Sequence, residues 1–474
     1  MSTTQSLHER RSHHDGFAAL RTQVRGRVAT ATDPDWDQVR GAWNLHVDQR
    51  PAAVVHATDV DDVVATVRFA RQHGYSVGAQ PSGHAGTNAL DGTIILRTRQ
   101  LGGIEVDTAT RTARVGAGVK VRELQAALTG TGLSSLPGSN GDPSVVGYTL
   151  GGGLSWFGRK YGLAANHVKA LEVVRADGEH VRVTAETDPD LFWALRGGGG
   201  DFAIVTAMEI GLVDAPYIYG GRLMWPQEMA GEVLRTYAEV TRNAPEELST
   251  WAWLLNFPPV EDVPEPIRGK SFVAIDFTYL GPKVVAEMLV APFHALGTPV
   301  MDTIGEVPVG EVGLLAQEPD DPTPAMEGGR ILHTLDDHTI WSILAVAGPE
   351  TQSPLTAIGI RHLGGALGRA ADGAGVTTRL DGEYLLFLLG IPAVPEIVPA
   401  IRERMSAMEA AMAPFSEGRQ FFNFLPSSDP SSAIGAEELA RLREIKRRRD
   451  PLGVIRSNRP VLVPAREEEF SPVG

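Results

Sequence analysis

The chain of 474 residues contains no cysteine. Disulfide bonds, thiolate nucleophiles and cysteine-ligated metals are therefore excluded, and any redox chemistry must come from a cofactor. Positive charge is also scarce, because 43 Lys and Arg residues stand against 58 Asp and Glu residues, a net charge of -15. A field of this sign repels phosphate, so we expect no nucleic acid among the partners of this protein.

Long apolar runs are absent as well. No stretch approaches the roughly 18 apolar residues of a membrane span, so we expect no membrane partner. Residues 1–27 are polar and rich in His, Arg and Ser, without the apolar segment of a secretory signal, which favours a cytoplasmic location. Apolar residues make up 43% and charged residues 21% of the chain, which is ordinary for a folded protein of two domains.

Several common catalytic motifs are missing. No Rossmann glycine spacing follows the first expected strand, and Gly269-Lys270-Ser271 lacks the earlier glycine of a P-loop, where Pro264 stands. The segment 153–158 is one residue too long for the nucleophile elbow of a hydrolase. There is no His-Glu-x-x-His motif, and we predict no metal site.

What the sequence does contain is an alternation of short apolar runs, helical patterns and turn residues over 52–213. We expect strands at 52–55, 75–77, 93–96, 103–106, 113–115, 171–174, 180–183 and 203–206, and helices from Asp59 or Asp61 to Gly74, at 121–128 and at 188–195. Ala176-Asp177-Gly178 between two of these strands is a strong hairpin signal. The pattern indicates an α+β region.

From about Tyr217 the composition changes, and proline clusters separate helical segments at 228–243 and 284–296. Residues 358–363 and 383–388 are expected to form adjacent core strands. The basic run 441–449 is expected to be helical, and a solvated helix face is the favoured interpretation over a nucleic-acid contact. These features predict a second domain.

Three glycine-containing clusters, at 82–86, 147–153 and 197–200, are candidates for binding phosphate. Consecutive glycines permit a close approach of backbone amides to phosphate oxygens. Each cluster alone is a weak signal, because such runs more often mark tight turns, but their occurrence together is stronger. His84 stands between Gly83 and Ala85-Gly86, so its ring projects from a turn of small residues.

These segments resemble the berberine bridge enzyme-like branch of the vanillyl-alcohol oxidase, or PCMH-type, flavoprotein superfamily. The similarity extends from Trp43-Asn44 to Arg456-Ser457-Asn458. Its strongest parts are Ser82-Gly83-His84, Gly147-Tyr148-Thr149-Leu150-Gly151-Gly152-Gly153, Arg159-Lys160-Tyr161-Gly162-Leu163, and the stretch from Leu195-Arg196 to Val205-Thr206.

The resemblance implies an α+β fold with a two-subdomain PCMH-type FAD-binding domain and a substrate domain whose antiparallel sheet is covered by helices. The implied boundaries are an N-terminal extension and helix at 1–46, the FAD-binding domain at 47–215, the substrate domain at 216–435, and a segment returning to the FAD domain at 436–474. In that family the histidine aligned with His84 is bonded to the 8α-methyl carbon of FAD. Many relatives add a bond from a cysteine, but Asn140 occupies that position, so only the His84 bond is implied here.

The family motifs also imply which residues contact FAD. They are Gln80, Pro81, Ser82, Gly83, His84, Ala85, Gly86, Pro137, Gly138, Ser139, Asp142, Val146, Gly147, Thr149, Gly152, Gly153, Ile204, Val205, Asn423 and Asn458. Residues 421–424 are expected to form a strand lining the cofactor pocket, with Asn423 hydrogen-bonded to flavin or backbone.

The implied function is that of an FAD-dependent oxidoreductase, in which a small-molecule substrate gives hydride from a C-H bond next to O or N to flavin N5, and molecular oxygen reoxidises the flavin. Many relatives use a tyrosine as, or beside, the base where this chain has Phe421, which cannot take a proton. His362 and Tyr384 are candidate bases instead. The alternatives are a non-redox enzyme such as a cyclase that retains FAD structurally, and a flavin-binding protein without catalysis.

Overall fold

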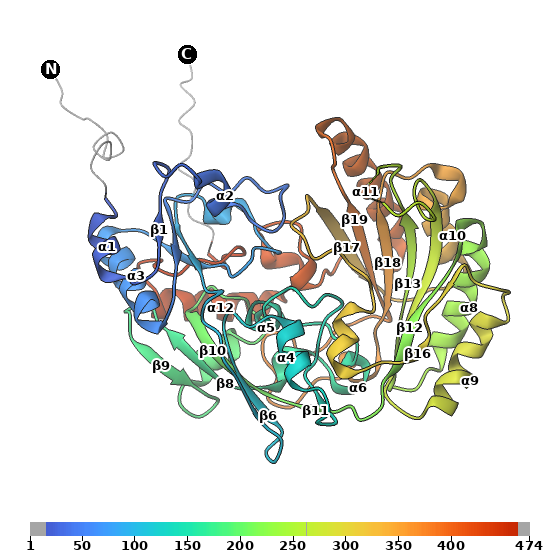
Figure 1. Cartoon of the computed structure of the whole chain (residues 1–474), viewed down its shortest axis with the longest axis horizontal. Helices are drawn as coiled ribbons and strands as arrows, with labels where there is room; N and C mark the ends of the chain where they lie inside the picture. The colour runs from blue at the N-terminus through green and yellow to red at the C-terminus, as the bar shows by residue number, and fades with distance from the viewer. Residues whose placement is uncertain (1–15, 262, 463–474) are drawn as a thin grey trace.

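The computed structural model describes residues 16–261 and 263–462. Two halves lie side by side in Figure 1. The half that contains the N-terminal strands also includes α12 (Ala436–Arg449), although this helix comes late in the chain. The other half is built on one large sheet with helices on its outer face.

The smaller sheet of the first half leads directly to His84. Its strands follow the order β1-β2-β4-β3, and they are β1 (Val28–Ala29), β2 (Ala53–His56), β4 (Ile94–Arg97) and β3 (Val77–Ala79). β4 pairs in parallel with both β2 and β3. The amphipathic helix α3 (Val60–His73) joins β2 to β3; Asp59 caps its start and Gly74, with φ of +72°, ends it, as the sequence predicts.

The second sheet of the first half is antiparallel, with the order β5-β6-β10-β8-β9. Its strands are β5 (Ile104–Asp107), β6 (Thr112–Gly116), β10 (Ile204–Gly211), β8 (Val168–Val174) and β9 (His180–Val183). The β8-β9 hairpin around Asp177-Gly178 confirms the hairpin predicted from the sequence, and β5 and β6 form a second antiparallel pair. The other short elements of this half are α1 (Ala18–Gln23), α2 (Trp36–Arg40), α4 (Val121–Ala127), α5 (Val145–Leu150), α6 (Gly158–Tyr161), α7 (Pro189–Ala194), β7 (Leu133–Ser134) and β11 (Val213–Asp214).

The second half contains an eight-stranded antiparallel sheet with the order β15-β12-β14-β13-β18-β19-β17 and β16 beside β12. The strands are β12 (Tyr219–Pro226), β13 (Leu248–Asn256), β14 (Ser271–Tyr279), β15 (Met301–Asp302), β16 (Gly305–Glu306), β17 (Met326–Leu332), β18 (Ala357–His362) and β19 (Tyr384–Gly390). Helices α8 (Ala230–Arg242), α9 (Lys283–His294), α10 (Asp337–Ala347) and α11 (Val398–Met412) cover one face of this sheet (Figure 1). The α+β class with a helix-covered antiparallel sheet, expected from the sequence, is confirmed.

Strand alternation divides the side chains of this sheet between two environments. Ile358 and Ile360 of β18 and Leu386 and Leu388 of β19 pack into the hydrophobic core beneath the helices. The residues between them point to the opposite face, toward the first half, where aromatic side chains form a separate cluster. This inner face is where the two halves of the molecule meet.

Arg159 of α6 fastens the two halves together. Its Nε atom donates a hydrogen bond to the carbonyl oxygen of Leu363 at 2.8 Å, and Nη1 donates to the carbonyl oxygen of Pro245 at 2.7 Å. Nη1 also donates to the carbonyl of Leu248. The guanidinium therefore joins the segment after the second glycine cluster to the ends of β13 and β18, two central strands of the large sheet.

The basic run 441–449 forms the last part of α12, and its Arg441, Arg447 and Arg448 side chains are exposed, as the interpretation as a solvated face expects. Both guanidinium Nη atoms of Arg449 donate to the Asp188 carboxylate at 2.6 Å. Arg441 and Arg448 pair with Asp190 of α7. These charges hold α12 against the acidic start of α7, so their partners lie inside this protein.

Residues 421–424 are not the strand that their aromatic composition suggested, since Phe422–Phe424 form a single 3₁₀ turn. Phe421 packs into an apolar cluster with Leu154 and Leu163, while Phe422 packs into the core of the first half. Phe424 packs against a third cluster, that of the inner sheet face. Successive side chains of a turn point in different directions and can reach three clusters, whereas a flat strand presents only two faces.

In the part of the chain that the structure describes, no helix is both long and apolar enough to cross a membrane.

Candidate functional site

His84 lies in a loop directly after β3. Gly83 has φ of +95°, and a Cβ atom there would lie 3.0 Å from the Cα atom of Ala42, so both the backbone angle and the space require glycine. The indole of Trp43 stacks on the imidazole, with ring centroids 4.4 Å apart. The hydroxyl oxygen of Ser82 is 2.8 Å from Nδ1 of His84. The imidazole is therefore held both through one face and through one nitrogen.

The second nitrogen of His84 has no such partner. Nε2 is buried and makes no hydrogen bond among the described residues, and Oδ2 of Asp142 lies 3.5 Å away. Burial lowers the pKa of His84 to about 4, an effect that outweighs the attraction of the Asp142 carboxylate. His84 is thus neutral at pH 7, and a neutral imidazole keeps a lone pair that can act as a nucleophile or acceptor.

The segment after α12 closes the His84 loop from outside. Oδ1 of Asn458 accepts a hydrogen bond from the backbone N-H of Thr87 at 2.8 Å, and Nδ2 donates to Oε1 of Gln80 at 3.1 Å. Arg459 donates from Nη1 to the carbonyl oxygen of Ala85 at 3.2 Å. Two predicted FAD contacts, Gln80 and Asn458, therefore bind one another and support the loop.

The second glycine segment, residues 137–153, includes α5 and is hydrogen-bonded to Asn423. Ser144 caps α5 by accepting a hydrogen bond from the N-H of Gly147 at 3.0 Å. Asn423 accepts from the N-H of Gly153 at 3.1 Å and donates to the carbonyl oxygen of Tyr148 at 3.0 Å. Asn423 is thus hydrogen-bonded to backbone, which is one of the two roles expected from the sequence.

Other predicted contact residues lie along the same segments or in the core behind them. The side chains of Val146, Ile204 and Val205 belong to the hydrophobic core of the first half, so only their backbone atoms are available to a cofactor. Asp142 lies beside His84, where its carboxylate accepts a hydrogen bond from Arg122 at 2.9 Å. The remaining residues lie on the His84 loop or the second segment: Pro81, Gly86, Pro137, Gly138, Ser139, Thr149 and Gly152.

Asn140 stands where the resemblance implies a cysteine in many relatives. Its Nδ2 atom donates to the carbonyl oxygen of Pro319 at 3.0 Å, and its Oδ1 atom accepts from the N-H of Asp142 at 2.6 Å. Asn140 therefore connects the second segment to the loop before β17.

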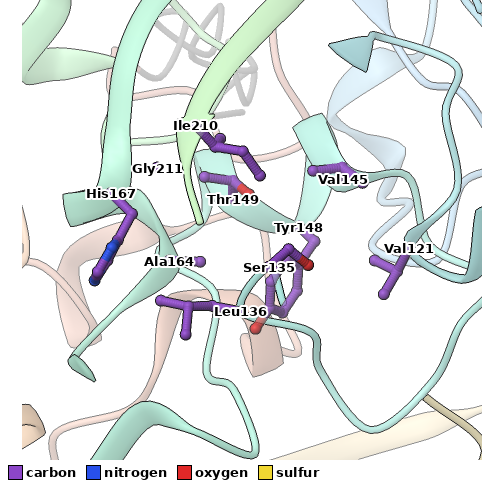
Figure 2. A pocket seen from close by; sticks show the side chains of 10 residues that line it. All are labelled: Val121, Ser135, Leu136, Val145, Tyr148, Thr149, Ala164, His167, Ile210 and Gly211. Atoms are coloured by element: carbon purple, nitrogen blue, oxygen red, sulfur yellow. The ribbon is translucent and has the colours of Figure 1, made fainter. Parts of the chain in front are cut away.

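A small cavity lies behind α5, as Figure 2 shows. Its volume is about 10 Å³, which is at most enough for one water molecule. The cavity therefore cannot hold a flavin. It is lined by Val121, Ser135, Leu136, Val145, Tyr148, Thr149, Ala164, His167, Ile210 and Gly211.

The inner face of the large sheet carries a charged group enclosed by aromatic rings. The guanidinium carbon of Arg361 lies 4.2 Å from the ring centroid of Trp251, 4.7 Å from that of Phe424 and 5.5 Å from that of Phe387. The indole of Trp156, from the first half, stacks on Trp251 with centroids 3.5 Å apart. Residues of both halves thus form this enclosure.

The structure does not place the two predicted bases, His362 and Tyr384, on this inner face. Tyr384 packs into the core beneath the helices, and its hydroxyl forms a 2.6 Å hydrogen bond with that of Thr241. His362 pairs with Tyr384 across β18 and β19 and stacks on its ring. Because side chains alternate along a strand, Arg361 rather than His362 points inward. Burial also lowers the pKa of His362 and raises the pKa of Tyr384.

Sequence reasoning missed Glu327 of β17. It pairs with Leu389 of β19, which packs against the inner aromatic cluster, so the carboxyl group belongs to the inner face. Glu327 makes no hydrogen bond or ion pair within 4.0 Å among the described residues. Burial raises its pKa to about 7, while the charges of Arg459 and Arg361 oppose that rise. A single acidic residue in a strand whose other residues, apart from Arg330, are small or apolar was the available sequence signal.

The segment 421–425 brings these features together. Asn423 binds the second glycine segment, and the ring of Phe424 lies over Arg361 of the sheet. The carbonyl of Leu425 accepts a hydrogen bond from Arg459, which also binds the His84 loop. The two glycine segments and the inner sheet face therefore converge on one site. Within 16–261 and 263–462 no cluster of three potential metal ligands occurs.

Comparison with known proteins agrees with this architecture. Residues 51–184 match the family described as an FAD binding domain. The (R)-6-hydroxynicotine oxidase of Paenarthrobacter nicotinovorans is 29% identical over 301 residues, which is 62% of this chain and 64% of that enzyme. An FAD-linked oxidoreductase of Dictyostelium discoideum is 24% identical over 89% of this chain and 90% of its own. The alignment with the nicotine oxidase thus spans slightly less than two thirds of that relative.

Solved structures show the same fold. The BBE-like 1 protein of Physcomitrella patens superposes with a TM-score of 0.82 at 20% identity, covering 96% of this chain and 100% of its own. The berberine bridge enzyme of Eschscholzia californica gives a TM-score of 0.80 at 19% identity over 95% and 100% of the two chains. The chain therefore contains an FAD-binding domain, is homologous to FAD-linked oxidoreductases, and has the fold of berberine bridge enzyme and its structural relatives.

Proposed function

We propose that this protein is an FAD-dependent oxidoreductase that oxidises a small organic molecule at a C-H bond next to O or N, with molecular oxygen as the final electron acceptor. The observation that carries the proposal is the neutral His84, whose buried Nε2 atom has no hydrogen-bond partner, inside the matched FAD-binding region. FAD supplies a two-electron acceptor, while the protein supplies orientation and electrostatics. Relatives named as oxidases support the choice of oxygen.

The residues of the site fit FAD. The His84 loop and the segment 147–153 offer backbone N-H groups next to glycines, and Gly83, Gly152 and Gly153 all have positive φ. We propose that one nitrogen of His84 is bonded to the 8α-methyl carbon of the flavin. This bond is the only protein-flavin bond that we propose, since Asn140 replaces the second attachment residue and the chain has no cysteine.

We propose Glu327 as the proton acceptor, in place of His362 and Tyr384. Its carboxyl group belongs to the inner sheet face, and a pKa of about 7 leaves a large fraction ionised at neutral pH. In its ionised form the Glu327 carboxylate takes the proton from a substrate O-H or N-H group while the carbon bonded to that O or N is oxidised. Phe421 cannot perform this step, and its ring packs among apolar side chains.

The non-redox alternative, a cyclase that retains FAD structurally, is motivated by Phe421 alone. Anaerobic mixing with substrate separates the two functions, because an oxidoreductase bleaches the flavin while a cyclase turns over without bleaching it. The named relatives, which include a glucooligosaccharide oxidase of Sarocladium strictum, favour the redox function.

The cofactor proposal is tested by intact mass of purified protein and of His84→Ala, with flavin fluorescence of the denatured protein. We expect an FAD-sized mass increment in the wild type and none in the variant. A colourless protein that does not bind added FAD would refute the proposed function, whereas FAD released on denaturation would refute only the covalent bond. The domain boundaries stay predictions that limited proteolysis can test; they lie near residues 47, 216 and 436. The cytoplasmic location stays a prediction that cell fractionation can test.

A further inference from the structure

Arg361 is a buried cation without a hydrogen-bond partner. Its exposed fraction is 2%, yet among the described residues no atom accepts a hydrogen bond from its guanidinium. The nearest carboxylate oxygen belongs to Glu318 and lies 3.9 Å from Nη2, and the Glu318 side chain is itself partly exposed. An isolated charge in this position is costly, because burial removes its water and nothing replaces the lost hydrogen bonds.

Two other buried arginines of this chain, Arg222 and Arg159, each donate several hydrogen bonds. Arg222, on the same inner face, donates from Nε and Nη2 to the two carboxylate oxygens of Asp276 at 2.6 and 2.8 Å, and again to the carbonyl of Ala316. Arg159 donates to carbonyl groups of both halves of the protein. The fold thus provides acceptors for these guanidinium groups, and Arg361 stands apart from them.

The surroundings of Arg361 define what could bind it. Aromatic rings cover the guanidinium, with Trp251 at 4.2 Å and Phe424 at 4.7 Å, but rings provide no in-plane hydrogen-bond acceptor. Two more buried atoms nearby also lack partners: the hydroxyl of Tyr148 and Nε1 of Trp156, which stacks on Trp251. The site therefore presents several unpaired donors between aromatic walls.

A monovalent anion fits this arrangement better than a phosphate. Only one cation is unpaired there, and Glu318 and Glu327 add negative charge close by. A carboxylate matches the planar fork of a guanidinium with two parallel hydrogen bonds. The aromatic walls suit the flat or apolar body of such an acid.

We infer that Arg361 binds the carboxylate of the substrate, so that the substrate class is an organic acid with an aromatic or apolar body. This inference rests on the proposed function, because it deepens the description of the same site. It assigns Arg361 to substrate binding and not to the fold. The oxygen that accepts hydrogen bonds from Arg361 can belong to the substrate or to the cofactor, and the experiment separates these two sources.

The test uses the FAD-loaded protein with benzoate, phenylacetate and 4-hydroxybenzoate as probes and the uncharged benzamide as the matched control ligand. Affinities are measured by calorimetry, which needs neither turnover nor a change in flavin colour. We expect Arg361→Gln to weaken carboxylate binding at least tenfold and Arg361→Lys to weaken it less, because lysine keeps the charge and loses the fork. Benzamide affinity should be the same for all proteins.

Arg369→Gln is the control variant, since Arg369 is exposed and pairs with Glu246 on the surface. Its affinity for each probe should equal that of the wild type. The inference is overturned if no carboxylate binds the wild type, if Arg361→Gln binds carboxylates as tightly as the wild type, or if that variant loses FAD while its carboxylate affinity is unchanged. Arg361-dependent binding without flavin reduction by any oxidisable acid would uphold this inference and refute the proposed function.

Discussion

Nε2 of His84 lies 3.5 Å from Oδ2 of Asp142, and the imidazole is nevertheless uncharged. The carboxylate of Asp142 accepts hydrogen bonds from Lys120 and Arg122 instead, and these two cations also lower the pKa of His84. Asp142 therefore neutralises its basic neighbours, and His84 remains in the form that a covalent bond to a cofactor requires.

Replacement of His84 by alanine should change how stability depends on pH. Because the pKa of His84 falls from 6.5 to about 4 on folding, the unfolded chain binds the proton more tightly, and stability is lost as pH falls from about 6.5 toward 4. The contribution is of the order of 3 kcal/mol at most. Urea unfolding of FAD-free protein at pH 7 and pH 5 measures it. His84→Ala should lose less stability over this interval than the wild type, and equal losses would contradict the assignment.

Replacement of Glu327 by glutamine should slow the proton transfer that depends on its carboxylate. With a pKa raised to about 7, the wild-type carboxyl group is protonated below that pH, so the rate of flavin reduction should rise with pH and level off above about 7. Glu327→Gln should be slower by roughly 10²- to 10⁴-fold and lose this pH dependence. Anaerobic stopped-flow measurements test both expectations.

The control for Glu327 is Glu350→Gln, at an exposed surface position. Infrared difference spectra provide a second readout, independent of turnover. They should show a carboxylic acid band that titrates near pH 7 in the wild type and in Glu350→Gln but is missing from Glu327→Gln. A pH profile retained in Glu327→Gln would assign the proton acceptor elsewhere.

Replacement of arginine by methionine should have opposite effects on stability at Arg361 and at Arg222. Arg361→Met removes a buried charge that has no hydrogen bond and only the 3.9 Å contact with Glu318, and it should stabilise the ligand-free protein by about 1 to 3 kcal/mol. Arg222→Met leaves the carboxylate of Asp276 buried without its partner and should destabilise it by about 3 to 5 kcal/mol. Thermal and urea unfolding measure both. Destabilisation of similar size in the two variants would mean that Arg361 supports the fold.

Asn423→Ala should weaken the connection between the two halves. The substitution leaves the N-H of Gly153 and the carbonyl of Tyr148 without partners, which costs about 1 to 3 kcal/mol for each buried group that water does not reach. We expect a lower urea midpoint and lower FAD content after purification. Asn140→Ala, which removes hydrogen bonds to Asp142 and Pro319 near the surface, should have the smaller effect.

Features set by short segments were predictable from the sequence. The caps of α3 and the hairpin at Asp177-Gly178 depend on residues within a few positions of one another. The resemblance of the glycine segments to a flavoprotein family extended this prediction to the fold, and the structural comparisons confirm it.

The inner face of the sheet was harder to predict, because a strand pattern does not say which face meets the rest of the protein. Ile358 and Ile360 share one face of β18 with His362, whereas Arg361 shares the opposite face with the small residues Ala357 and Gly359. That alternation could have separated His362 from Arg361, but β19 is apolar on both faces and gave no such signal for Tyr384. The strand predicted for residues 421–424 was wrong, because their turn is determined by packing against three apolar clusters whose members come from distant parts of the sequence.

Asn458 contacts Thr87 across 371 positions of sequence. During synthesis the His84 loop leaves the ribosome long before residue 458, so the hydrogen bonds from Asn458 form only after most of the described chain has been made. We therefore expect a chain truncated before Asn458 to hold the His84 loop less firmly and to retain less flavin than the full chain.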